Sequence, residues 1–233
     1  MKNNLFSAAM AYASKGWPVF PCDPSTKRPK TKNGFKDAST DPARIQKWWS
    51  TWSDAAIATP TGSRPDACGA FVLDVDLPDG PASLESLTAA HGALPETVQQ
   101  RTGGGGFQFF FSYPDGMEIR NSAGKIGAGL DIRGVGGYVI LPPSGHPSGG
   151  TYRWASENGV SLAGAPAWLL DILNAPSKPL ARPMVEVKDN TNAYGSKALE
   201  AEVGRVAMAP EGQRNHALNA AAFSLGQLVG GGV

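Results

Sequence analysis

Three short segments, far apart in the chain, each alternate apolar residues with charged or amide residues, and they span residues 71–77, 106–111 and 130–133. Side chains two apart in a β-strand point to the same face. The polar faces of these predicted strands carry, in order, Asp74 and Asp76, then Gln108, then Asp131 and Arg133. The opposite face of the first strand carries Phe71, Leu73, Val75 and Leu77. If the strands share one sheet, three carboxylates, an amide and a guanidinium meet on one surface.

Such a surface has a specific chemical use. Clustered carboxylates repel one another unless a cation lies among them, and dense oxygen ligands suit Mg²⁺ or Mn²⁺. Two-metal sites for phosphoryl or nucleotidyl transfer need several carboxylates of this kind. Asp74 and Asp76 alone are less specific, because glycosyltransferases use a similar pair and an exposed strand can carry two acids without function. Asp131 and the neighbouring Arg133 favour the metal site.

Glycines occupy four consecutive positions, 103–106, just before Gln108. No Gly-Lys-Ser/Thr follows, so this is not a Walker A loop. The segment predicts a hairpin turn, whose bare backbone would also let a phosphate or a template strand approach closely. Ser144 and His146 lie in a later loop, but no nucleophile-elbow motif or partner acid supports a Ser/His nucleophile pair.

Net charge, cysteine content and the length of apolar runs limit what kind of protein this chain can be. The chain has 233 residues and a net charge of +1, so nucleic-acid binding would require a local patch. One candidate patch is a basic loop that contains Lys27, Arg28, Lys30 and Lys32. The alternative interpretation is a solvated loop without a binding role. The two cysteines, Cys22 and Cys68, are too few for a zinc ribbon and fit a reducing cytoplasm. No apolar run approaches the ~20 residues that cross a bilayer.

Periodicity and turn residues place the remaining elements. Helices are expected at residues 4–15, 42–52, 81–91 and 167–173, and further strands at 17–20 and 55–58. Two hairpins are expected, one joining 98–102 to 107–113 and one joining 130–133 to 138–141. Residues 176–196 are predicted to be a linker, and residues 197–233 two helices that either pack on the main domain or belong to a longer protein.

The order of these motifs resembles the bifunctional primase-polymerase (Prim-Pol) domain of the archaeo-eukaryotic primase superfamily. The resemblance covers residues 5–175 and rests on residues 34–41 with Trp48 and Trp49, then 72–76, 102–111, and 129–138 continuing into 142–144. It implies an α+β fold with an RRM-like antiparallel catalytic sheet beside a small α/β lobe. It also implies a catalytic domain at 1–175, followed by a short C-terminal helical segment at 197–233 that often leads toward a helicase.

The resemblance also assigns roles to residues. Asp74, Asp76 and Asp131 match the metal-binding acids for Mg²⁺ or Mn²⁺, and Gln108 stands where the family usually has a histidine that contacts nucleotide phosphates. The nucleotide-binding candidates are Gln108, Arg133, Gly105, Gly106 and Ser144. The candidates for contact with the single-stranded DNA template are Lys27, Arg28, Lys30 and Lys32. Glutamine donates a hydrogen bond but cannot become cationic, so triphosphate binding is expected to differ from that of the family.

Three functions follow as hypotheses. The first is a nucleotidyltransferase that makes or extends primers from dNTP or NTP in the replication of a phage, plasmid or integrated element. The second, motivated by Gln108, is a catalytically weak replication module that binds single-stranded DNA or nucleotide. The third is a nucleotide-sugar transferase that uses Asp74 and Asp76, although no paired nucleotide-binding domain is recognisable in the sequence.

Overall fold

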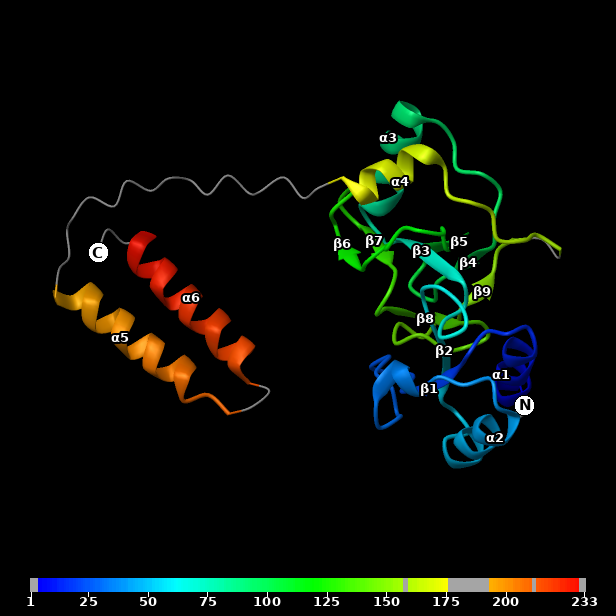
Figure 1. Ribbon diagram of the computed structural model, residues 1–233, viewed down its shortest axis with the longest axis horizontal. Coiled ribbons are helices and arrows are strands. Elements are labelled where there is room, and N and C mark those ends of the chain that lie inside the picture. The colour runs from blue at the N-terminus through cyan, green and yellow to red at the C-terminus, as the bar shows by residue number, and fades with distance from the viewer. Residues whose placement is uncertain (1–3, 157–158, 176–192, 211–212, 231–233) are drawn as a thin grey trace. The chain divides into compact units, whose positions relative to one another are not determined.

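The computed structural model describes residues 4–156, 159–175, 193–210 and 213–230. The chain separates into two compact units, residues 1–176 and 177–233 (Figure 1). Helices and antiparallel sheets are mixed in the first unit, as expected for an α+β protein. The second unit is helical in its described part.

The larger sheet of the first unit has six strands in the order β6-β7-β3-β5-β4-β9, and every neighbouring pair is antiparallel. The strands are β3 (Ala70–Val75), β4 (Gln99–Arg101), β5 (Phe107–Ser112), β6 (Ser122–Ala123), β7 (Leu130–Arg133) and β9 (Arg153–Trp154). The hairpin predicted around the four glycines is confirmed, because β4 pairs with β5. The central strand β3 lies between β5 and β7, so the three polar segments of the sequence are direct neighbours.

The smaller sheet has three antiparallel strands in the order β1-β2-β8. These strands are β1 (Phe20–Cys22), β2 (Ala56–Pro60) and β8 (Tyr138–Leu141). The elements that accompany them are α1 (Asn4–Ser14), the 3-10 turn η1 (Gly34–Asp37) and α2 (Pro42–Thr51). Helix α2 begins as predicted, with the Asp41 carboxylate accepting the backbone N–H of Ala43 at 3.0 Å.

The predicted second hairpin is wrong, because β7 and β8 belong to different sheets. Two of the connecting glycines have no room for a side chain: a Cβ on Gly134 would meet the Ile119 carbonyl, and one on Gly137 would meet Asn121. The backbone N–H of Gly134 donates to Asn121 Oδ1 at 2.8 Å, and that of Val135 to the Ile119 carbonyl at 2.8 Å. These contacts with residues 119–121 turn the chain away from β7 and direct it into the smaller sheet.

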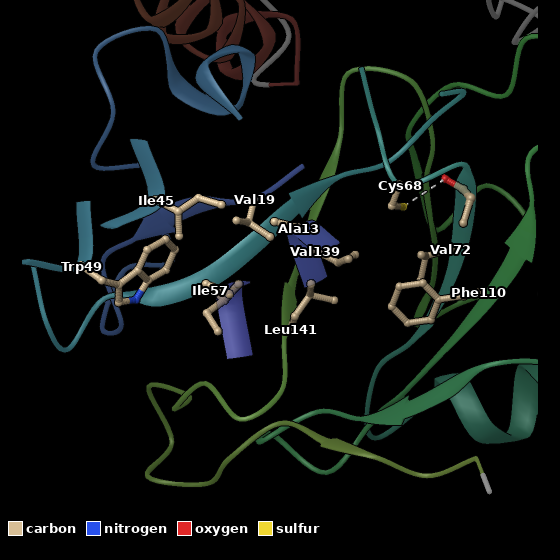
Figure 2. Packing of buried hydrophobic residues seen from close by; sticks show 12 residues of the cluster. Ala13, Val19, Ile45, Trp49, Ile57, Cys68, Val72, Phe110, Val139 and Leu141 are labelled. Carbon is tan, nitrogen blue, oxygen red and sulfur yellow. Dashed lines mark hydrogen bonds between the residues drawn. The ribbon is translucent and has the colours of Figure 1, made fainter. Parts of the chain in front are cut away.

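The larger sheet has an apolar core on each of its two faces. One lies between the two sheets, where Val72 and Phe110 meet Ile57, Val139 and Leu141 from the smaller sheet (Figure 2). Residues Ala13, Ile45 and Trp49 of the two N-terminal helices complete this core. The other core covers the opposite face of the larger sheet, which is packed against α3 (Gly80–His91) and α4 (Ala167–Asn174).

The sequence predicts that Leu77 continues the apolar face formed by Phe71, Leu73 and Val75. This prediction is wrong, because Leu77 is 55% exposed. Strand β3 ends at Val75, and the backbone N–H of Asp76 donates to the Gly129 carbonyl at 2.8 Å. The Asp76 carbonyl in turn accepts the N–H of Gly80 at the start of α3. The chain therefore leaves the sheet before it reaches Leu77.

The second unit contains α5 (Ala193–Ala207) and α6 (Arg214–Gly230), which pack against each other. Most of the linker predicted at 176–196 lies outside the described residues, and α5 begins within it at Ala193. Among the residues that the structure describes, no helix is both long and apolar enough to cross a membrane.

Candidate active site

The polar residues of the three central strands form one row across the larger sheet. Asp74 on β3 lies directly opposite Gln108 on β5 and Asp131 on β7. The row extends one strand further, because Gln108 is paired in turn with Gln100 on β4. The predicted meeting of these residues on one face is therefore found for Asp74, Gln108, Asp131 and Arg133.

The Arg133 guanidinium joins the two carboxylates of this row. Its Nη2 lies 3.3 Å from Asp74 Oδ2 and 3.0 Å from Asp131 Oδ2. The other oxygen of Asp131 accepts the backbone N–H of Gly124 at 3.0 Å. The Asp74 side chain is 8% exposed, whereas that of Arg133 is 36% exposed, so the arginine is within reach of a ligand.

Two glutamines connect Asp74 to both sheets. Gln108 Nε2 donates to Asp74 Oδ1 at 3.0 Å, and Gln108 Oε1 accepts a short hydrogen bond from Gln100 Nε2. The same Gln100 nitrogen donates to the Ile140 carbonyl on β8 at 2.8 Å. Sequence reasoning missed Gln100, although its place in the middle of the strand predicted to pair with the Gln108 strand was the available signal. Gln108 thus acts first as a fixed donor that orients the Asp74 carboxylate.

Asp74 and Asp76 differ in environment. Burial, and secondarily the charge of Asp76, raises the pKa of the Asp74 carboxyl above its usual 3.8, although Gln108 and Arg133 act in the opposite direction. Asp76 follows the end of β3 and is exposed. The pair predicted to stand together on one strand face therefore consists of a buried carboxylate within the sheet and an exposed one just beyond it.

The three acids supply the oxygen ligands that Mg²⁺ and Mn²⁺ prefer. In the described ranges of the chain, however, no three His, Cys, Asp or Glu side chains are arranged to hold a metal ion. The Arg133 guanidinium instead contacts one oxygen of Asp74 and one of Asp131. The donor chemistry of the acids suits a divalent cation, but the arrangement of the described side chains does not form a cation site.

A cavity of about 310 Å³ opens onto this row of side chains. Besides Asp74, Gln108 and Arg133, its lining includes Lys27, Asn121, Tyr138 and Tyr152. The Lys27 ammonium lies 6.0 Å from the centre of the Tyr152 ring, and the Tyr138 hydroxyl donates to the Lys27 carbonyl at 3.1 Å. Burial raises the pKa of Tyr152, and the charges of Asp74 and Asp76 add to this effect. Asn121, Tyr138 and Tyr152 were missed because none of them belongs to the three polar segments.

The basic loop divides into residues with different surroundings. Lys27 lines the cavity. The Lys30 ammonium lies 3.7 Å from Asp23 Oδ2 and over the ring of Trp52, so both residues hold it against the protein surface. Arg28 and Lys32 are exposed. Only Lys27 of the four predicted template contacts is therefore placed beside the carboxylates.

The glycine turn is closely packed. A Cβ on Gly106 would meet the Val75 carbonyl, and Gly105 has φ +96°, a conformation that favours glycine. The His146 side chain lies against Gly103 and Gly104, and Ser148 Oγ donates to the Gly103 carbonyl at 2.8 Å. Partial burial, and secondarily the charge of Lys27, lowers the pKa of His146. This histidine, set aside as a nucleophile, thus lies beside the turn.

Ser144 has a structural environment. Its side chain is fully buried, and its Oγ accepts the backbone N–H of Ile57 on β2 at 2.8 Å. The residue does not line the cavity that contains Asp74 and Arg133. The structure therefore places Ser144 where it secures the smaller sheet, away from the row of polar side chains.

Fold and site together define an α+β protein that presents carboxylates, amides and cations around a cavity on an antiparallel sheet. Residues 9–168 match the family model described as bifunctional DNA primase/polymerase, N-terminal, or Prim-Pol. This match covers more than half of the chain, and the chain belongs to the Prim-Pol family. No curated protein matches the sequence. Family membership implies primase/polymerase activity in DNA replication, with DNA and nucleotides as substrates.

Proposed function

We propose that this chain is a metal-dependent nucleotidyltransferase that synthesises or extends primers on a single-stranded DNA template. One observation carries the proposal: Asp74, Gln108 and Asp131 are in register on three adjacent strands. Asp74 and Gln108 line a cavity that Lys27 and Arg133 also line. In the reaction, a 3′-hydroxyl attacks the α-phosphate of a dNTP or NTP, and pyrophosphate leaves. The fold is proposed to be that of archaeo-eukaryotic primases.

The three acids would hold Mg²⁺ or Mn²⁺. When bound, such ions activate the attacking hydroxyl and neutralise charge on the reacting phosphate. Asp74 is held in one orientation by Gln108, while Asp76 is exposed and free to turn toward a ligand. Asp131 is oriented by the Gly124 N–H. The chain thus supplies two positioned carboxylates and one adaptable carboxylate.

Arg133 and Lys27 are proposed as the triphosphate ligands. A triphosphate should bind the half-exposed Arg133 more strongly than Asp74 and Asp131 do, because both carboxylates already accept hydrogen bonds from other donors. Its arrival would withdraw the guanidinium from Asp74 and Asp131, which frees both acids in the same step. Gln108 already forms hydrogen bonds with Asp74 and Gln100. Lys27, which lines the cavity, is therefore the proposed substitute for the cationic histidine of the family. Backbone groups of Gly105 and Gly106 remain candidates for phosphate contact.

The template is proposed to pass the basic loop, where Arg28 and Lys32 are exposed. Lys30 contributes less directly, because Asp23 and Trp52 already contact its ammonium group. Replication of a phage, plasmid or integrated element in the cytoplasm is the proposed setting. A helicase in a longer parent chain is the proposed partner.

Primer extension on a primed single-stranded template, with Mg²⁺ or Mn²⁺, tests this function. The sharpest variant is Asp76→Asn, because its exposed side chain can change without disturbing the sheet. We expect wild type to extend the primer and Asp76→Asn to lose extension with its melting temperature unchanged. Asp54→Asn, an exposed acid in the turn before β2, is the matched control and keeps full activity. Wild-type extension by Asp76→Asn would refute the proposed role of the acids.

A second function is favoured by one observation, the contact of Arg133 with both carboxylates. A site that keeps this internal cation when nucleotide is present would bind nucleotide or single-stranded DNA without catalysis. The two functions differ in one measurement, which is nucleotide affinity with and without Mn²⁺. Affinity that rises with Mn²⁺ supports the nucleotidyltransferase, whereas binding that is indifferent to metal and accompanied by no extension supports the binding module.

A further inference from the structure

The face of the larger sheet that is opposite the carboxylates contains a second cavity, of about 440 Å³. It lies between α3 and strand β5, and apolar side chains form most of its lining, namely Val75, Leu84, Leu94, Phe107 and Phe109. Ligand sites in proteins have volumes of roughly 300–1,000 Å³ and predominantly apolar walls. The cavity is therefore of a size and composition that suit one or two apolar side chains.

Two arginines stand at the edge of the sheet beside this cavity. Arg101 on β4 and Arg153 on the edge strand β9 are directly opposite each other in the antiparallel register, so they share the sheet face of Phe107. Both are exposed, and the Arg101 guanidinium lies 5.5 Å from the centre of the Phe107 ring in the cavity wall. Like charges that face each other across strands are unfavourable. None of the described carboxylates forms an ion pair with either arginine.

We propose that this arginine-flanked cavity binds a peptide segment of a partner protein in which acidic residues adjoin apolar residues. Acidic side chains of the peptide would neutralise the Arg101–Arg153 pair, and its apolar residues would enter the cavity over Phe107 and Phe109. Charge complementarity identifies the occupant, because the paired arginines lack an acidic partner within the described chain.

A nucleic-acid strand fits this surface less well than a peptide. The cavity wall offers few polar groups with which a base could form hydrogen bonds. An apolar peptide side chain needs no polar partner in the cavity, and its acidic neighbours would lie over the arginines, at the β4–β9 edge. The occupant inferred from the chemistry is therefore a peptide.

The position of the site has a consequence for function. Gln100 points to the carboxylate face, where it contacts Gln108, whereas its neighbours Gln99 and Arg101 point to the other face by strand alternation. A peptide bound over Phe107 would leave the cavity beside Asp74 open. The proposal goes beyond the activity proposed for the carboxylate face and does not depend on it.

The test is fluorescence polarisation of a labelled peptide in which a run of aspartates precedes leucine and phenylalanine. We expect the wild-type chain to bind it, and Arg101→Glu/Arg153→Glu to bind about tenfold more weakly or worse, as expected for the loss of two exposed charge pairs. Thr88→Trp, at a half-buried wall position of α3, should also weaken binding by filling the cavity. Melting temperatures establish that each variant folds.

Arg44→Glu is the matched control. Arg44 is also exposed and stacks over an aromatic ring, 5.6 Å from the centre of Trp48, but it lies on α2. Unchanged affinity in this variant, together with weak binding of a peptide that has aspartates alone, supports the proposal. Absence of binding to wild type, equal affinity in all variants, or equally effective competition by a single-stranded oligonucleotide would overturn it.

Discussion

The Asp74 carboxylate and the Arg133 guanidinium lie 3.3 Å apart on neighbouring strands, and the same nitrogen of Arg133 lies 3.0 Å from Asp131. The resting site therefore holds a cation of its own between two acids. Removing one partner from such a partly buried arrangement leaves uncompensated charge, which costs more than the net worth of the pair. The free energy of unfolding, as well as activity, should therefore respond to substitutions of Asp74, Asp131 and Arg133.

Arg133→Gln should destabilise the chain in metal-free buffer by about 1–2 kcal/mol, because Asp74 and Asp131 would then repel each other without a cation. Urea unfolding measures the loss, and added Mn²⁺ should restore more stability to this variant than to wild type. Arg120→Gln is the control, because Arg120 pairs with Glu118 at 2.8 Å but both side chains are exposed. Equal responses of Arg133→Gln and wild type to Mn²⁺ would contradict the proposed metal site.

Asp74→Asn should reveal the raised pKa of this carboxyl through the pH dependence of stability. Burial, the largest cause, favours the protonated form in the folded state. This stabilising contribution is complete below the ordinary pKa of 3.8 and is lost as pH rises through the folded pKa. Because asparagine resembles the protonated acid, the stability of the variant relative to wild type should increase between acidic and neutral pH. A relative stability that instead falls over this range in urea titrations would reverse the assignment.

Gln108→Ala should cost about 1–3 kcal/mol of unfolding free energy, because it removes the buried donor to Asp74 Oδ1 and leaves Gln100 Nε2 with the Ile140 carbonyl as its acceptor. Gln100→Ala should cost a similar amount through the loss of the Ile140 contact. The two changes act on one network, so the double variant should be less destabilised than the sum of the single variants. Additive losses in a double-mutant cycle would show that the two amides act independently.

Gly106→Ala should disturb the turn that lies beside the site. A Cβ at this position would meet the Val75 carbonyl, at the end of the strand that carries Asp74, so we expect a loss of about 1–3 kcal/mol. Gly145→Ala is the matched change, because nothing lies within 4 Å of a Cβ there. Thermal melting should separate the two variants, and a melting temperature for Gly106→Ala equal to that of Gly145→Ala would show that the turn yields without cost.

Strand alternation alone is enough to predict much of the site. The period of two places Asp74 opposite the apolar face of its strand, and the same argument applies to Gln108 and to Asp131 with Arg133. Their meeting on one face follows if the strands share a sheet, which β3, β5 and β7 do. Local signals such as the Asp41 cap and the glycine turn are equally reliable, because their physics is contained in a few neighbouring residues.

Long-range contacts decided what the sequence alone could not. The glycine-rich segment 134–137 looks like a hairpin turn, but the packing of Gly134 and Gly137 against residues 119–121 directs β8 into the other sheet and so brings Tyr138 into the cavity. Ser144, a candidate ligand by residue type, is a buried partner of Ile57. The residue types and spacing therefore determined the chemistry that the strands can offer. Only the tertiary structure decided that Arg133 sits between Asp74 and Asp131, because that contact depends on strands more than fifty residues apart in the chain.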